Sequence, residues 1–98
     1  MKTIWKYPFR VDDRFSIDMP KGAKVVHAQS QNLRTHIWAL VDTEADIEKR
    51  WFRVYGTGAE IVGKIDWIDG PDSPELISFV CTFPMAGAQL IWHLFEEL

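Results

Sequence analysis

The feature that most constrains this 98-residue chain is a repeated alternation of apolar and polar side chains with a period of two. It runs through residues 15–19, 51–55 and 77–83, and almost no stretch keeps a helical period for long. Successive side chains of an extended strand point to opposite faces, so this alternation is typical of strands with one buried face. The sequence therefore predicts a mainly β fold.

Turn-forming residues divide the alternating runs into about seven strands. We expect strands at residues 3–9, 14–19, 24–30, 33–42, 49–56, 75–83 and 88–95. The third and fourth should form a hairpin turning at residues 31–32, and the fifth should pair antiparallel with the fourth across residues 43–48. The chain is then a single β domain over residues 1–98, a small antiparallel sandwich or a partly closed barrel.

Two stretches leave the secondary structure open. Residues 59–68 fit a helical face through Ile61, Ile65 and Ile68 as well as a strand face. Residues 90–95 are apolar on both faces, which favours a central strand over the alternative of a helix.

Composition excludes several classes of function. The formal net charge is −3 with no basic run, which argues against binding to duplex nucleic acid. One cysteine excludes an internal disulfide. No apolar run approaches the length of a membrane span, and the N-terminus does not resemble a signal peptide. We therefore expect a cytoplasmic protein that is not associated with a membrane. Five tryptophans are expected to lie mostly in the core.

No catalytic residue, metal site or cofactor is predicted. His27 and His36 would be neighbours in the predicted hairpin, but two histidines are too few for a convincing metal site. Cys81 and His93 could meet on the last two strands, although Cys81 is expected to be buried and inert. Whether the chain is an enzyme stays uncertain, and a binding protein is favoured.

The candidate binding surface is the fifth strand and the turn that follows it. It comprises Trp51, Arg53, Tyr55, Gly56, Thr57 and Gly58. Alternation places the first three on one face, and an arginine between two aromatic rings is a typical composition of a recognition hot spot. Glycines after a strand can also form a backbone nest for an anion. The alternatives are an ordinary outward face and a strand-ending turn with positive φ.

Four segments, residues 2–8, 38–42, 52–58 and 92–96, resemble a family of small bacteriophage and prophage proteins with no assigned function. The resemblance covers nearly the whole chain. It departs from the family at residues 61–74, and at Cys81, where relatives tend to have glycine. It implies a phage or prophage origin and carries no catalytic or binding residue.

With that origin, we expect a small binding protein that inhibits a host factor, such as a defence protein, or sequesters a small nucleotide signal. The alternative is an accessory or structural virion protein. Residues 37–41 and 90–95 are apolar on both faces, which a small monomer would struggle to cover, so a homodimer in the host cytosol is also expected.

Overall fold

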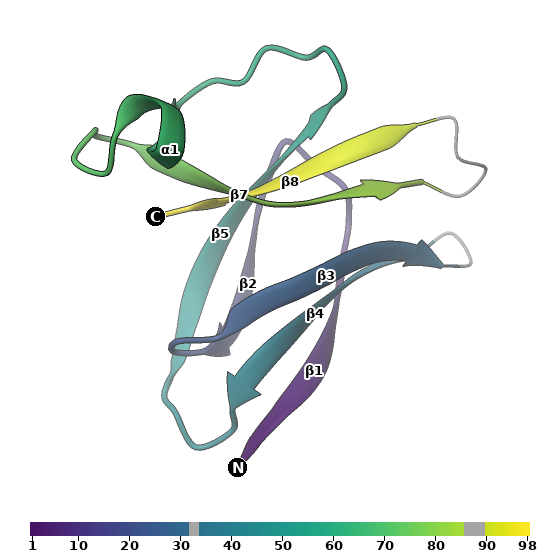
Figure 1. Ribbon diagram of the computed structural model, residues 1–98. Coiled ribbons are helices and arrows are strands. Elements are labelled where there is room, and N and C mark those ends of the chain that lie inside the picture. Colours follow the sequence, from purple (N-terminus) through teal and green to yellow (C-terminus); the bar gives the residue numbers. More distant parts are fainter. Residues whose placement is uncertain (32–33, 86–89) are drawn as a thin grey trace.

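The computed structural model describes residues 1–31, 34–85 and 90–98, and it confirms the predicted β fold (Figure 1). Within these residues the strands form two sheets rather than a closed barrel. The elements are β1 (Lys2–Phe9), β2 (Arg14–Pro20), β3 (Lys24–Gln31), β4 (Arg34–Asp42), β5 (Ile47–Gly56), β6 (Lys64–Ile65), α1 (Asp66–Asp69), β7 (Leu76–Pro84) and β8 (Ile91–Glu97).

One sheet has three strands in the order β1-β4-β3, and the other has five in the order β2-β5-β8-β7-β6. All neighbours are antiparallel except β6 and β7, which are parallel. The predicted β3–β4 hairpin is confirmed by the pairing of Ala28 with Ile37. Of its predicted turn at residues 31–32, Gln31 belongs to β3 and residue 32 lies outside the described residues.

The prediction that β5 pairs with β4 was wrong. β5 lies between β2 and β8 in the other sheet, so the connection at residues 43–46 crosses from one sheet to the other. The reason is burial. Ile37 and Val41 in β4, and Phe52 in β5, are all almost fully buried. Two strands that each carry one apolar row bury both rows when they pack face to face in separate sheets.

The last strand, β8, is central, as its two apolar faces predicted, and the helical alternative was wrong. It buries the adjacent residues Leu94 and Phe95, which point to opposite faces. Of its predicted first residues, 88 and 89 lie outside the described residues.

Residues 59–68 are neither a full helix nor a full strand. The chain is irregular up to Gly63, continues as the two-residue strand β6, and then forms the one-turn helix α1. Gly70, with φ 93°, ends this helix. We call the segment that joins β5 to β7, residues 57–75, the connection.

The core lies between the two sheets, and no tryptophan belongs to its buried cluster, although the partly buried Trp92 packs against it. This corrects the expectation that most of these rings lie in the core. Three alanines, Ala23, Ala28 and Ala39, are part of the buried cluster, and their small side chains leave room for phenylalanine rings. Phe9, Phe15 and Phe52 stack in series, with centroid distances of 4.7 and 5.5 Å. The bulkier indole rings stay partly or largely exposed: Trp5, Trp38, Trp51, Trp67 and Trp92.

Candidate functional site

The alternation in β5 is confirmed. Phe52 and Val54 are buried in the core, while Trp51, Arg53 and Tyr55 are partly exposed on the outer face of the five-stranded sheet. Local spacing alone fixed this division, because neighbouring side chains in a strand cannot share a face.

The segment after β5 is a tight turn. The Ala59 amide donates to the Gly56 carbonyl at 3.1 Å, and Gly58 has a φ of +85° that favours glycine. This supports the alternative of a strand-ending turn for the two glycines. Gly56 has ordinary φ, and a Cβ there would lie 3.5 Å from the ring of Trp92, an ordinary van der Waals contact.

A shallow pocket of about 270 Å³ opens beside this turn. We call it the aromatic pocket, because the rings of Tyr55, Phe79 and Phe95 line it with His93 and Ile61. Phe95 stands edge-to-face against both other rings, at centroid distances of 5.6 Å to Tyr55 and 5.5 Å to Phe79. Gly56, Thr57, Gly58 and Ala59 complete the wall, so four of the six predicted site residues belong to one pocket.

A β-bulge between Phe79 and Cys81 puts Phe79 on the outer face. Phe79 pairs with Phe95, but Cys81 pairs with Leu94, so an extra residue reverses the facing of everything that follows. Strict alternation would have given Phe79 and Phe83 the same face. Instead Phe83 is fully buried and Phe79 is 47% exposed.

His93 links the turn to β7 through both ring nitrogens. Its Nε2 lies 2.8 Å from Thr57 Oγ1, and its Nδ1 lies 2.8 Å from Thr82 Oγ1. Cys81 and His93 lie on adjacent strands but do not meet, since the bulge turns Cys81 toward the core, where it was expected, and Thr82 toward His93. His93 was not among the predicted site residues, although alternation in the last strand places it on the same face as Phe95.

Trp51 and Arg53 do not line the aromatic pocket. They belong to an ion-pair cluster, in which Glu97 accepts hydrogen bonds from Arg14 Nε at 2.6 Å and from Arg53 Nε at 2.8 Å. Arg14 also covers Trp51, its Cζ lying 3.9 Å from the ring centroid. The hydrogen bonds from Arg14, together with the one from Arg53, lower the pKa of Glu97 from 4.5 to about 2 against the opposing effect of burial.

Arg53 and Tyr55 hold the connection against the sheet. Arg53 Nη1 donates to the Val62 carbonyl at 2.7 Å, and the Tyr55 hydroxyl donates to the same oxygen at 3.0 Å. Arg53 is therefore occupied by a carboxylate and a carbonyl. This differs from the predicted free cation beside two rings. Glu97 carries no signal in the sequence, because it is 44 residues from Arg53.

A family model described as a domain of unknown function (DUF7352) matches residues 1–98, the whole chain. The chain belongs to the DUF7352 family. Neither the curated proteins nor the solved structures gave a match.

The other candidate side chains of this DUF7352 domain, His27, His36 and Cys81, do not line the aromatic pocket. His27 and His36 both lie beside Trp38, at ring-centroid distances of 5.8 and 6.0 Å. Within the described residues, no group of three or more histidine, cysteine or acidic side chains is placed to hold a metal ion. Burial raises the pKa of the Cys81 thiol. In the described ranges, no helix has the length and apolar character needed to cross a membrane.

Proposed function

We propose that this protein is a binding module without a catalytic site, and that its aromatic pocket receives an apolar side chain of a partner protein. The observation that carries the proposal is the group of three rings on an outer sheet face, in which Phe79 is 47% exposed, Tyr55 is partly exposed and Phe95 is buried. Such a face is normally polar in an antiparallel sandwich. Binding hot spots are typically aromatic or apolar anchors that fill well-packed pockets.

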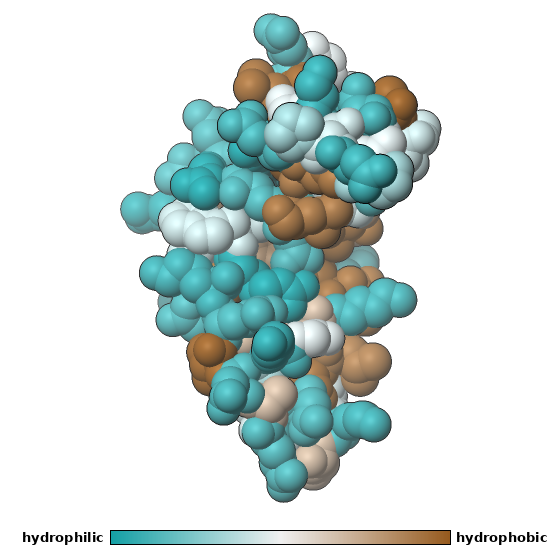
Figure 2. Space-filling model, turned by 90° about the vertical axis from the view of Figure 1, so that its left-hand side faces the viewer, coloured by the Kyte–Doolittle hydropathy of each residue, from teal (hydrophilic) through white to brown (hydrophobic). Residues whose placement is uncertain are grey.

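The surroundings of the pocket also fit a protein surface. Besides Ile61 of the pocket wall, the connection exposes the large apolar side chains of Val62 at 67%, Trp67 at 75% and Ile68 at 61%. Figure 2 shows the side of the molecule on which α1 lies in Figure 1. Hydrophilic side chains cover most of it, and hydrophobic ones form patches among them. Apolar patches rimmed by polar residues are typical of protein interaction sites.

A nucleotide fits this pocket less well. Arg53 was the cation expected to hold a phosphate, but its guanidinium donates to Glu97 and to the Val62 carbonyl. A phosphate would have to displace a carboxylate that the same guanidinium already binds. The pocket wall itself is mainly apolar, which favours a side-chain anchor.

The resemblance to phage proteins supports a host protein in the cytosol, such as a defence factor, as the partner. A partner inhibited by capture needs a recognition surface on this chain and no catalytic group. A second copy of this chain is the competing occupant, since a homodimer is expected from the apolar strands.

Photo-crosslinking tests the proposal. Benzoylphenylalanine replaces Phe79 in one variant and Val26 in another, and both are exposed to host lysate. Val26 is the matched control, because it has the same exposed fraction of 47% and lies on β3 of the other sheet. We expect one protein to be crosslinked from position 79 and not from position 26, and unlabelled wild type to compete while Phe79→Lys does not.

Two results would refute it. A crosslinked product made of two copies of this chain would assign the pocket to a homodimer. Equal products from both positions, or none that wild type competes away, would show that the aromatic pocket has no protein partner.

A further inference from the structure

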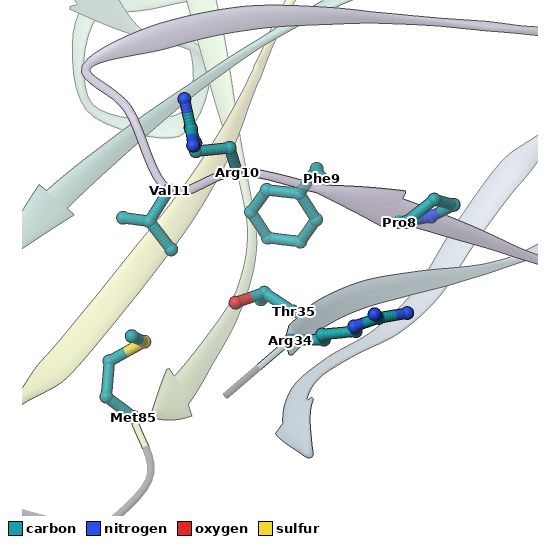
Figure 3. A pocket seen from close by; sticks show the side chains of 7 residues that line it. All are labelled: Pro8, Phe9, Arg10, Val11, Arg34, Thr35 and Met85. Atoms are coloured by element: carbon teal, nitrogen blue, oxygen red, sulfur yellow. The ribbon is translucent and has the colours of Figure 1, made fainter. Parts of the chain in front are cut away.

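A second cavity, of about 670 Å³, opens where β1 ends and β4 begins (Figure 3). Phe9 and Thr35 come from the three-stranded sheet and Met85 follows β7, so this end cleft lies between the two sheets. Its volume falls within the range of about 300–1,000 Å³ that is usual for small-molecule sites. Its lining includes the side chains of Phe9, Arg10, Val11, Arg34, Thr35 and Met85.

Thr35 is a polar side chain in an apolar position. It continues the inward row of Ile37, Ala39 and Val41, and it is only 6% exposed. Its hydroxyl points into the end cleft in Figure 3. Its cross-strand partner Ser30 has a buried Oγ that lacks a hydrogen-bond partner among the described residues.

The unpaired buried hydroxyl of Ser30, directly across from Thr35, requires an explanation. A buried polar group without a hydrogen bond is destabilising, so native structures almost always provide a partner. The hydroxyl of Thr35 is next to an open volume lined otherwise by the apolar side chains of Phe9, Val11 and Met85. A ligand with an apolar body and one hydrogen-bonding group would satisfy both parts of this wall.

The rim of the end cleft is positively charged. Arg10 and Arg34 are exposed there, on either side of Phe9 in Figure 3, and neither forms an ion pair with a described residue. The other arginines of the chain each pair with a glutamate: Arg14, Arg50 and Arg53. In a chain with net charge −3, two uncommitted guanidinium groups at one opening form a local site for an anion.

We propose that the end cleft binds a small organic anion, with its planar or apolar body against Phe9 and Met85 and its phosphate or carboxylate at the arginine rim. Thr35 would contact a polar atom of the body, and Arg10 and Arg34 would swing toward the anionic group. The site lies at the end of the sandwich, away from the outer face that carries the aromatic pocket. It does not depend on the proposed function.

Titration of the isotope-labelled full chain, followed by amide chemical shifts, tests this inference. The probes are adenosine and guanosine monophosphates, the corresponding neutral nucleosides, inorganic phosphate and indole acetate. We expect saturable shifts at Val11, Thr35 and Met85 with the monophosphates. The nucleosides and phosphate alone should bind at least about tenfold more weakly, since each lacks half of the contacts. The indole acetate arm separates carboxylate from phosphate recognition.

Variants locate the effect. Thr35→Val keeps the shape of the buried side chain and removes its hydroxyl, and Arg34→Gln removes one cation. Each should raise the dissociation constant by about tenfold. Lys6→Gln is the control, because Lys6 pairs with the outward Trp38 on the same sheet and lies outside the cleft. The control should bind as wild type does, and the same spectra report whether each variant is folded.

Three results would overturn the inference. They are the absence of saturable shifts with every probe up to millimolar concentration, an equal loss of affinity in Lys6→Gln, and unchanged binding by both Thr35→Val and Arg34→Gln.

Discussion

Replacing Glu97 by glutamine removes the charge that holds three strands together on the outer sheet face. Arg14 and Arg53 lie directly opposite one another in the β2–β5 register, and Glu97 of β8 bridges them. Its carboxylate accepts two hydrogen bonds from Arg14, at 2.6 and 2.9 Å, and one from Arg53, at 2.8 Å. The neutral amide leaves two like charges facing each other and turns an N–H donor toward a guanidinium.

The expected loss of stability follows from the pKa of Glu97, which falls from 4.5 to about 2 on folding. One pKa unit corresponds to about 1.4 kcal/mol, so the full shift corresponds to about 3 kcal/mol. Glu97 is 19% exposed, but Arg14 is 51% exposed, and water screens that side of the cluster. We therefore expect Glu97→Gln to lower the free energy of unfolding by about 1–2 kcal/mol at neutral pH.

The pH dependence has a definite sign. The pKa of Glu97 is lower in the folded chain than in the unfolded chain, so its contribution is fully present above about pH 4.5. It is lost as the pH falls toward 2, where the folded carboxylate takes up its proton. The difference between wild type and Glu97→Gln should therefore be constant near neutral pH and shrink steadily between these limits.

Urea unfolding followed by tryptophan fluorescence at a series of pH values measures this difference. Glu60→Gln is the control, because it makes the same chemical change at an exposed glutamate with no ion pair to a described residue. If Glu97→Gln destabilises no more than Glu60→Gln at pH 7, or if the gap persists unchanged in acid, the assignment of the cluster is wrong.

Three further predictions concern the connection and the core. Tyr55→Phe removes one of the two hydrogen bonds to the Val62 carbonyl, so amide exchange at residues 59–64 should accelerate while the unfolding free energy falls by about 1 kcal/mol or less. Gly63→Ala should lower the midpoint of thermal unfolding more than Gly58→Ala does. Both glycines have positive φ, but only at Gly63 would a Cβ meet Arg53 Nη1, at 3.0 Å. Equal midpoints of the two variants would contradict this close approach. Cys81 should react slowly with a thiol reagent at pH 8 until urea is added, because burial raises its pKa; rapid labelling of the folded chain would show that the thiol is accessible.

Local spacing determined which side chains of a strand face inward. The division of β5 into a buried row with Phe52 and an outer row with Arg53 needs only the period of two, so the sequence predicted it. The same reasoning located the turn at Gly58 and the central place of β8. Four of the six predicted site residues lie in one pocket because they are contiguous in the chain.

Pairing across the chain was decided by the tertiary structure. Nothing near β5 reveals that β2 and β8 are its neighbours rather than β4, and the Arg14–Glu97 pair joins residues 83 positions apart. Because the sequence does not reveal this strand register, it predicted Arg53 as a free cation. Side-chain volume likewise decided the core, where Ala28 and Ala39 of the three-stranded sheet share the buried cluster with Phe52 and Phe83. Trp92 packs against that cluster without belonging to it.

The bulge in β7 shows most clearly what the sequence of a single strand does not predict. The sequence alternates regularly from Ile77 to Phe83, which predicts one shared face, yet Phe79 faces solvent and Phe83 faces the core. A bulge depends on the fit between two strands and two packing layers, not on the composition of one strand. The sequence by itself therefore determined the β class and the local facing of strands. Only the packing of the sheets decided which rings form the aromatic pocket and where the end cleft opens.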